Sequence, residues 1–197
     1  MEDIFFRIAE ILATITGFCC VFFEIKQKIA LWYFGIISAA LFLLVFFHQS
    51  FYAYALFQVY FIATSIYGLT QWKKSEKANG EGMPISRISL RLFAILLVLA
   101  VVLTFCLWQV LLTVNENSTY AFFDAVISTL SIIATWMLAK KYIEQWGAWF
   151  IADIISVGVF FSCGLYPTTL LYTAYVVMAV TGFILWRKQL KKQNQAA

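Results

Sequence analysis

Long apolar stretches separated by short polar connections run through almost the whole chain. A helix needs about 20 residues to cross the hydrocarbon core of a bilayer. Seven stretches approach or reach that length, at residues 4–23, 30–47, 53–72, 90–112, 121–139, 147–164 and 168–186. Their apolar runs are continuous and lack the alternation of a membrane β-barrel. The pattern therefore predicts seven transmembrane α-helices.

The composition agrees with a protein whose solvent is the lipid bilayer. Of the 197 residues, 63% are hydrophobic and 12% are charged, whereas the apolar share of a soluble domain is nearer half. We expect an all-α polytopic membrane protein with no separate soluble domain. The net charge of +4 is spread over several short connections, which does not indicate nucleic-acid binding.

The basic residues predict the orientation of the chain. Thirteen of the fourteen Lys and Arg residues follow the first, third, fifth or seventh stretch, and the exception is Arg7. Lys and Arg concentrate in cytoplasmic connections. We therefore expect a multi-pass protein of the cell's inner (plasma) membrane, with its N-terminus outside and its C-terminus in the cytoplasm.

Segments of the first three stretches recur in the last three. At an offset of 114, Tyr52-Ala-Tyr-Ala-Leu56 matches Tyr166-Pro-Thr-Thr-Leu170, and Gly68-Leu-Thr-Gln-Trp72 matches Gly182-Phe-Ile-Leu-Trp186. At an offset of 118, Gly35-Ile-Ile-Ser38 matches Asp153-Ile-Ile-Ser156. The last match places Gly35 where the second repeat has Asp153, so the predicted site is asymmetric.

The repeat predicts a 3+1+3 arrangement of two parallel three-helix repeats joined by one helix. We expect the first repeat at residues 1–72, a cytoplasmic linker and linking helix at 73–120, and the second repeat with a basic cytoplasmic tail at 121–197. Transporters built from such repeats bind their substrates near the midplane of the membrane.

The sixth stretch carries the most informative residues. Trp146, Trp149 and Asp153 share one helical face, at i, i+3 and i+7. An ionisable residue inside a membrane span is costly and is usually functional. Two indole rings and a buried acid suit a flat, cationic, aromatic guest. The alternative is that the tryptophans belong to the interfacial aromatic belt and the acid pairs with a neighbour.

Other polar and aromatic side chains would complete a cavity. Asp124, Ser128, Ser131 and Thr135 share one face of the fifth stretch, with Trp136 beside it. The third stretch adds Gln58, and the seventh adds Tyr172 and Tyr175. Small-molecule sites have such aromatic walls and few polar groups. Alternatively, the hydroxyl groups only form hydrogen bonds that hold the helices together.

Catalytic and cofactor motifs do not occur in the sequence. The single histidine, His48, is at a predicted membrane edge, and no glycine-rich phosphate loop or metal-ligand spacing is present. We expect neither an enzyme nor a cofactor or metal site. A membrane scaffold without a substrate remains an alternative, and an intramembrane enzyme is a weaker one.

The sequence resembles the PnuC-type family of B-vitamin transporters. The family motif WxxWxxxN/D is matched by Trp146, Trp149 and Asp153, and family-like segments occur at 140–146, 164–172, 54–58 and 65–68. The resemblance covers nearly the whole chain. It implies uptake of an unphosphorylated vitamin by facilitated diffusion, trapping by a cytoplasmic kinase, and a homotrimer with one pathway in each protomer.

The resemblance leaves the choice of vitamin open. Nicotinamide riboside carriers of the family commonly have Asn at the last motif position and the sequence Ala-Gln-Trp-Leu in the fifth stretch. This chain has Asp153 and Ala134-Thr-Trp-Met137, which favours the Asp-containing thiamine branch. Nicotinamide riboside, whose ring is also cationic, is a close second, and riboflavin is third.

Each candidate residue has an expected role in the substrate site. Trp146 and Trp149 would stack on the vitamin, and Asp153 would hold its amine or its positive charge. The remaining contacts and the lining of the path would come from Thr135, Ser131, Gln58, Trp136, Tyr172 and Tyr175.

Overall fold

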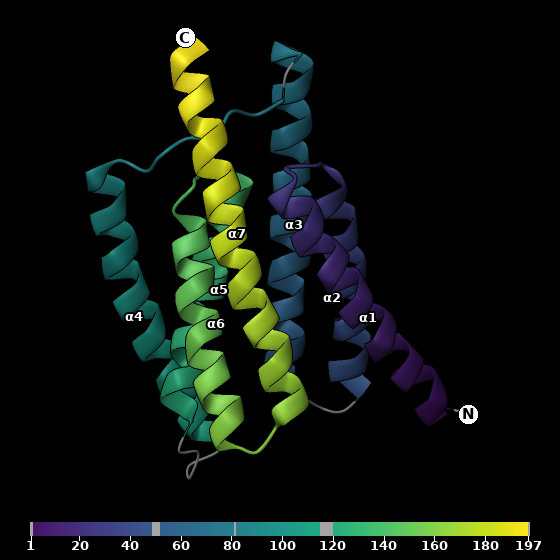
Figure 1. The fold of residues 1–197 in the computed structure, drawn as a ribbon. Helices are drawn as coiled ribbons and strands as arrows, with labels where there is room; N and C mark the ends of the chain where they lie inside the picture. The colour runs from purple at the N-terminus through teal and green to yellow at the C-terminus, as the bar shows by residue number, and fades with distance from the viewer. Residues whose placement is uncertain (1, 49–51, 81, 115–119, 197) are drawn as a thin grey trace. The chain divides into compact units, whose positions relative to one another are not determined.

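Seven α-helices account for nearly all of the computed structural model, which describes residues 2–48, 52–80, 82–114 and 120–196 (Figure 1). They are α1 (Glu2–Ile25), α2 (Ala30–His48), α3 (Tyr52–Asn79), α4 (Leu90–Val114), α5 (Ala121–Ala139), α6 (Gln145–Ser162) and α7 (Tyr166–Ala196). Each predicted stretch falls on one helix, and α3 and α7 continue well beyond their predicted ends. The all-α prediction is confirmed.

Six of the helices are long and apolar enough to span a membrane by length and composition. α3 does not pass the same threshold, because its tyrosines and polar side chains such as Gln58 and Thr64 lower the hydropathy. In α4 the most apolar window has no buried residue. A helix that exposes Val98, Val101 and Phe105 is stable only where the surroundings are apolar too.

The chain forms two compact units, residues Met1–Met83 and Pro84–Ala197. In the first unit α1 packs on α2 and α2 packs on α3. In the second unit α4 packs on α5, α5 on α6 and α6 on α7. The linking helix α4 thus packs with the second group of helices. The predicted division at residues 72 and 120 stays a prediction about the repeats.

The two three-helix groups share one register, at an offset of 114 throughout. α1 and α5 end at Ile25 and Ala139, α2 and α6 end at His48 and Ser162, and α3 and α7 begin at Tyr52 and Tyr166. The expected match of Gly35 to Asp153 is therefore wrong by four residues, because an apolar helix tolerates a local similarity shifted by one turn. The residue equivalent to Asp153 is Ala39, and Gly35 is equivalent to Trp149.

The turns before α2 and α6 are built alike. Gln27 and Lys141 both adopt a left-handed backbone, with φ of 55° and 56°. The Lys28 N–H donates to the Phe23 carbonyl at 2.9 Å, and the equivalent Tyr142 N–H donates to the Met137 carbonyl at 3.0 Å. Such bonds satisfy carbonyl groups that the end of a helix leaves unpaired.

Each three-helix group is held by a tryptophan placed against a glycine and a second tryptophan. Trp32 lies against Gly68 and Trp72, and Trp146 lies against Gly182 and Trp186. The ring centroids are 5.5 Å apart at 89° in the first pair and 5.6 Å apart at 86° in the second. A Cβ at Gly68 or Gly182 would lie 2.3 or 2.5 Å from the nearest indole carbon. Only glycine lets these helices approach so closely.

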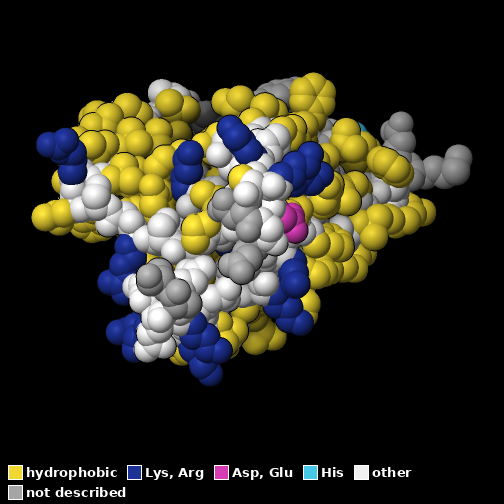
Figure 2. Space-filling model, turned by 90° about the horizontal axis from the view of Figure 1, so that it is seen from above, with side chains coloured by type: hydrophobic (Ala, Val, Ile, Leu, Met, Phe, Trp, Pro, Cys, Tyr) yellow, Lys and Arg dark blue, Asp and Glu magenta, His cyan; other side chains and the backbone are white. Residues whose placement is uncertain are grey.

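Basic side chains mark one end of the helices in each unit. In the first unit they follow α1 and lie on the last turns of α3; in the second they precede α4, follow α5 and lie on the end of α7. Figure 2, a view from above, shows Lys and Arg side chains in dark blue among hydrophobic side chains in yellow. The distribution agrees with the basis of the predicted orientation, which itself stays a prediction.

Candidate functional site

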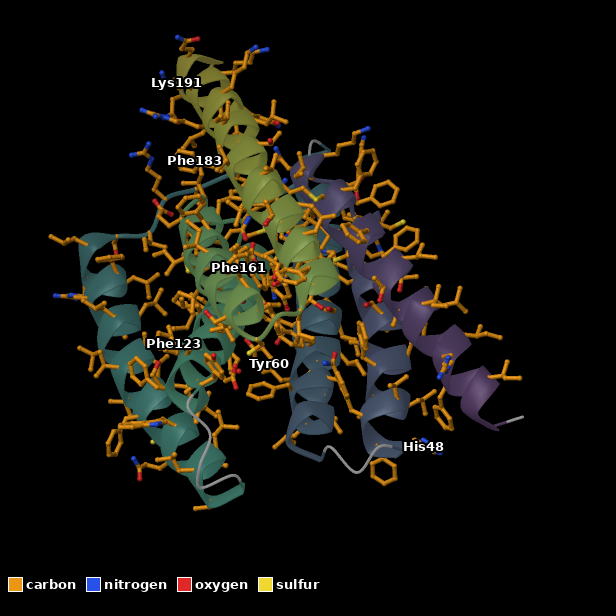
Figure 3. All side chains as sticks on the ribbon, turned by 60° about the horizontal axis from the view of Figure 1, so that its bottom comes forward. His48, Tyr60, Phe123, Phe161, Phe183 and Lys191 are labelled. Atoms are coloured by element: carbon orange, nitrogen blue, oxygen red, sulfur yellow. The ribbon has the colours of Figure 1, made fainter. Side chains whose placement is uncertain are left out.

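The candidate site lies on α6, between its two neighbours α5 and α7. The turn at residues 140–144 reverses the chain from α5 into α6. Gly164, with φ of 72°, reverses it again into α7. There the Leu165 N–H donates to the Phe160 carbonyl at 2.9 Å, and the Gly164 N–H donates to the Phe161 carbonyl at 3.0 Å. Figure 3 shows the side chains of these helices, with Phe161 labelled on α6.

Trp146 is the most completely buried of the predicted site residues. Its side chain is 2% exposed and fills the space beside Gly182, against the ring of Trp186. The equivalent Trp32 has the same contacts in the first unit. This geometry gives Trp146 a role in packing α6 onto α7. Its stacking on a ligand stays a prediction.

Asp153 is buried in the middle of α6 and is 7% exposed. No hydrogen bond or ion pair joins its carboxylate to another residue within the described part of the chain. Burying a polar or charged group without a partner is costly, so such a group is retained where something else satisfies it. A ligand group or a proton would do so.

Gln145 and Trp149 continue the buried stripe, since Gln145, Trp149 and Asp153 are spaced by four residues along α6. Gln145 is completely buried, and neither its amide nitrogen nor its amide oxygen has a hydrogen-bond partner among the described residues. The buried indole nitrogen of Trp149 has none either. This face of α6 therefore has amide, indole and carboxylate groups available for a polar ligand.

Gln145 was missed by the sequence analysis, because a glutamine at the start of a span looks like an ordinary interfacial residue. The repeat contained the signal. At an offset of 114, the equivalent residue is Leu31, which is buried and apolar. A polar residue that replaces an apolar core residue between repeats indicates a function rather than packing.

α5 forms one wall beside this stripe. Ser131 lies eight residues before the end of α5, and Asp153 lies eight residues after the start of α6. Because both helices rise by about 1.5 Å per residue, the two residues are at the same height above the turn. The Ser131 hydroxyl donates to the Ile127 carbonyl at 2.8 Å, and the Thr135 hydroxyl donates to the Ser131 carbonyl at 2.7 Å. Their donors are used within α5, while their oxygens can still accept hydrogen bonds. Trp136 lies at the end of this wall, 6.1 Å from the Tyr142 ring.

α7 supplies the opposite wall. The contact between Trp146 and Gly182 sets the register of α6 and α7, and the same count places Tyr175 level with Asp153. The Tyr175 ring is 5.7 Å from the Tyr172 ring, which stacks on Phe160 at 5.1 Å. The structure thus brings Ser131, Asp153 and Tyr175 to one level of the second unit. Gln58 belongs to α3 of the first unit.

An extended segment, residues 84–89, covers the turn between α5 and α6. The Ser86 N–H donates to the Lys141 carbonyl at 3.1 Å, and the Ile143 N–H donates to the Ser86 carbonyl at 3.0 Å. Glu144 accepts from the Ile88 N–H at 3.2 Å. Beneath this segment Lys141 is 6% exposed, and burial lowers its pKa from 10.5 to about 8. These hydrogen bonds therefore hold the N-terminal end of α6 in place.

The described residues contain no group of His, Cys, Asp and Glu side chains that could hold a metal ion. His48 lies at the end of α2, where its ring stacks on Phe6 at 3.6 Å between centroids. The other candidate groups of the second unit are aromatic rings, hydroxyls and an amide, which suit binding rather than acid–base chemistry.

The chain matches a protein-family model described as "Nicotinamide mononucleotide transporter" over residues 7–188. It is 28% identical over 211 aligned residues to the nicotinamide riboside transporter PnuC of Escherichia coli (strain K12), covering 95% of this chain and 88% of that protein. The transporter of the same name from Neisseria mucosa is 26% identical, over 93% of this chain and 73% of its own.

The fold is also similar to that of a solved structure, "Crystal structure of the Vitamin B3 transporter PnuC". The TM-score is 0.73 and the sequence identity is 25%. The match covers 93% of this chain and 82% of that one. The family model, the relatives and the fold thus agree with one another over nearly the entire chain.

Proposed function

This chain belongs to the nicotinamide mononucleotide transporter family of multi-pass membrane proteins, and from that premise we propose that it carries an unphosphorylated B-vitamin across the membrane. Relatives named as transporters of nicotinamide riboside support this proposal. They also argue against an enzyme, because both are named as transporters and the similarity extends over 88% and 73% of their lengths.

One observation carries the proposal. The buried face of α6 presents an amide at Gln145, an indole N–H at Trp149 and a carboxylate at Asp153, and none of these groups has a partner among the described residues. A buried polar group without a partner costs about 1–3 kcal/mol. A vitamin with an aromatic ring and both hydrogen-bond donors and acceptors would satisfy all of these groups at once.

Thiamine suits this stripe best. Its thiazolium ring is cationic, and its aminopyrimidine donates hydrogen bonds that a carboxylate at Asp153 accepts. Stacking of a cation on the Trp149 indole contributes about 0.5–2 kcal/mol. Nicotinamide riboside is the second candidate, because its ring is cationic and it appears in the names of the relatives. Riboflavin is neutral and larger, and is third.

The burial and spacing of residues in the second unit support the following contacts. Trp149 stacks on the ring, Asp153 binds the amine or the positive charge, and Gln145 binds polar atoms. Ser131 and Thr135, which belong to α5, accept hydrogen bonds from the vitamin. Trp146 positions α6 through its packing on Gly182. Contacts from Trp136, Tyr172 and Tyr175 complete the assignment, and a role for Gln58 stays a prediction from the sequence.

The proposed transport mechanism rests on the resemblance to the PnuC-type family. We propose facilitated diffusion, with trapping of the vitamin by a cytoplasmic kinase, in a homotrimer that has one pathway per protomer. The basic ends of the helices face the cytoplasm and the N-terminus faces outside, as the distribution of Lys and Arg favours.

Calorimetric titration of the detergent-purified chain with thiamine, nicotinamide riboside and riboflavin tests the function. Thiamine should bind most tightly. Asp153→Asn should weaken thiamine by about 1.5–3 kcal/mol, the contribution of a hydrogen bond to a charged group. The same variant should weaken nicotinamide riboside less than thiamine, because the aminopyrimidine of thiamine also donates hydrogen bonds to the carboxylate. Glu76→Gln removes an exposed acid at the end of α3 and serves as the control.

The alternatives give different outcomes. A scaffold without a substrate would gain no thermal stability from any vitamin, whereas a ligand at 100 times its Kd adds about 2.7 kcal/mol. An intramembrane enzyme would change the vitamin chemically, which mass spectrometry detects. Unchanged thiamine binding by Asp153→Asn would remove the acid from the proposed site.

A further inference from the structure

The C-terminal part of α7 has two faces. One is packed against the rest of the second unit, with Gly182, Trp186 and Leu190 buried. The other forms a shallow groove lined by Phe183, Ile184, Arg187, Lys188 and Lys191. Figure 3 labels Phe183 and Lys191 on this helix. The lining residues are spaced at i, i+1, i+4, i+5 and i+8, which places them along one side of a helix.

The groove changes from apolar to cationic where the predicted span ends. Phe183 and Ile184 are 38% and 58% exposed and lie before Trp186, the last residue of that span. The three cations follow within the next turns of α7. Cations immediately beyond a span lie at the depth of the lipid headgroups. The chain thus offers an apolar surface to an acyl chain and, beyond it, positive charge to a headgroup.

No described side chain neutralises these cations. Arg187, Lys188 and Lys191 have no ion pair or ring contact with another described residue, and no Asp or Glu occurs in the sequence after Asp153. The equivalent end of α3 differs. Lys73, equivalent to Arg187, lies 5.2 Å from the centre of the Tyr33 ring, and Glu76 lies among the lysines of α3.

We propose that the groove on α7 binds an anionic phospholipid, with its phosphate at Arg187, Lys188 and Lys191 and its upper acyl chain along Phe183 and Ile184. A soluble phosphate matches only the cations and leaves the apolar half of the groove unused. The combination of both halves favours the lipid. This site is separate from the vitamin stripe on α6 and would anchor the end of α7 in one leaflet.

The two repeats provide a matched pair of variants for the test. Arg187→Gln, Lys188→Gln and Lys191→Gln together remove three charges from α7. Lys73→Gln, Lys74→Gln and Lys77→Gln together remove three charges from the equivalent positions of α3. The detergent-purified full chain is mixed with phosphatidylglycerol or with phosphatidylcholine of the same acyl chains, and bound lipid is measured by native mass spectrometry.

The unchanged chain should bind phosphatidylglycerol in preference to phosphatidylcholine. The α7 variant should lose this preference, by about fivefold for each charge removed, and the α3 variant should keep it. Phe183→Ala retains every charge and should weaken both lipids through the lost acyl contact. Vitamin binding by calorimetry should be the same in all variants, so that failure of one proposal is distinguishable from failure of the other.

Other results would overturn the site. Equal losses in the two triple variants would mean that only net charge matters. Displacement of phosphatidylglycerol by inorganic phosphate would show a soluble anion site, and equal binding of the two lipids would show a surface indifferent to headgroups. If the triple variant does not fold, Lys188→Gln removes a single exposed charge and should still lower phosphatidylglycerol binding about fivefold.

Discussion

The helices α1–α3 and α5–α7 share one scaffold but differ in what they bury. Both have the left-handed turn residue, at Gln27 and Lys141, and both place a tryptophan against a glycine. At the position of buried Gln145, the first repeat has buried Leu31, and at that of Asp153 it has Ala39. The shared features hold helices together, whereas the differences are polar groups without a partner among the described residues.

Two buried polar side chains, Ser38 and Asp153, show the same contrast. Ser38 in α2 donates to the Ala13 carbonyl of α1 at 2.9 Å and joins the two helices. On α6, Asp153 has no such bond with a described residue. A buried polar group that is paired stabilises the fold, and one that is unpaired costs free energy. The first repeat is therefore the better guide to the scaffold, and the second repeat is the better guide to the site.

The two repeats also differ in the sizes of the side chains around Trp149. Its equivalent is Gly35, where an added Cβ would lie 3.3 Å from the Ser65 hydroxyl and 3.5 Å from the Cys20 sulfur. The residues equivalent to Ser65 and Cys20 are Ala179 and Ala134, which are buried. Smaller neighbours in the second repeat thus leave room for the large indole. Close packing requires this kind of compensation.

The largest effect should come from removing the shared tryptophan. Trp32→Ala and Trp146→Ala should each destabilise the fold by about 3–5 kcal/mol, because each leaves a cavity beside a glycine that cannot fill it. Unfolding of the vitamin-free protein in detergent measures both. Trp108→Ala, in the partly exposed aromatic cluster of α4, should cost less. A small effect at Trp146 alone would separate the two repeats and refute its packing role.

The turn residues differ in charge, which predicts a pH-dependent contribution from Lys141 that Gln27 of the first repeat lacks. The pKa of buried Lys141 is about 8 in the folded chain and about 10.5 when unfolded. Between these values the unfolded state binds more protons, so stability should rise with pH, by at most about 3 kcal/mol. Below pH 8 the full cost of burying the ammonium remains.

Thermal unfolding from pH 7 to pH 10.5 measures that dependence. Lys141→Met should raise stability at pH 7 and flatten this part of the curve. Lys28→Met removes an exposed lysine of the equivalent first-repeat turn and should leave the slope intact. A slope that survives in Lys141→Met would assign the dependence to another group.

The glycines should show an intermediate effect. Gly68→Ala and Gly182→Ala would force a methyl group into Trp32 or Trp146, and overpacking of this kind costs about 1–3 kcal/mol. The matched control is Gly158→Ala in α6, where an added Cβ meets nothing within 4 Å. There the substitution should be neutral or slightly stabilising, because alanine favours a helix. Melting temperatures of the three variants test the contrast.

Much of the fold was predictable because lipid imposes a simple pattern. Each helix must satisfy its backbone internally, so apolar stretches mark helices directly. The register of the repeat was harder. Between two apolar helices, a shift of one turn keeps every side chain on nearly the same face, and the local match of Gly35 to Asp153 was misleading for that reason. The glycine–tryptophan contacts fix the register, and they are visible only in the three-dimensional structure.

The site was predictable only in part. A carboxylate inside a span, such as Asp153, stands out in any sequence. Gln145 does not, because glutamine is common at the ends of spans and only its burial without a partner distinguishes it. Trp146 and Trp149 look alike in the motif, and neither indole nitrogen has a hydrogen-bond partner among the described residues, yet it is Trp146 that packs against Gly182. Neighbours on other helices decide such roles, and a linear pattern does not contain them.

The smallest effect is predicted for a substitution that makes the second repeat resemble the first. Gln145→Leu installs the residue that the first repeat has at Leu31, and it removes a buried amide without a partner among the described residues. The vitamin-free protein should become more stable by about 1 kcal/mol, because the desolvation cost of the amide disappears. The same variant should lose part of the stabilisation that thiamine confers. A loss of stability without vitamin would instead show that the amide is satisfied inside the protein, and Gln145 would then belong to the scaffold that the two repeats share.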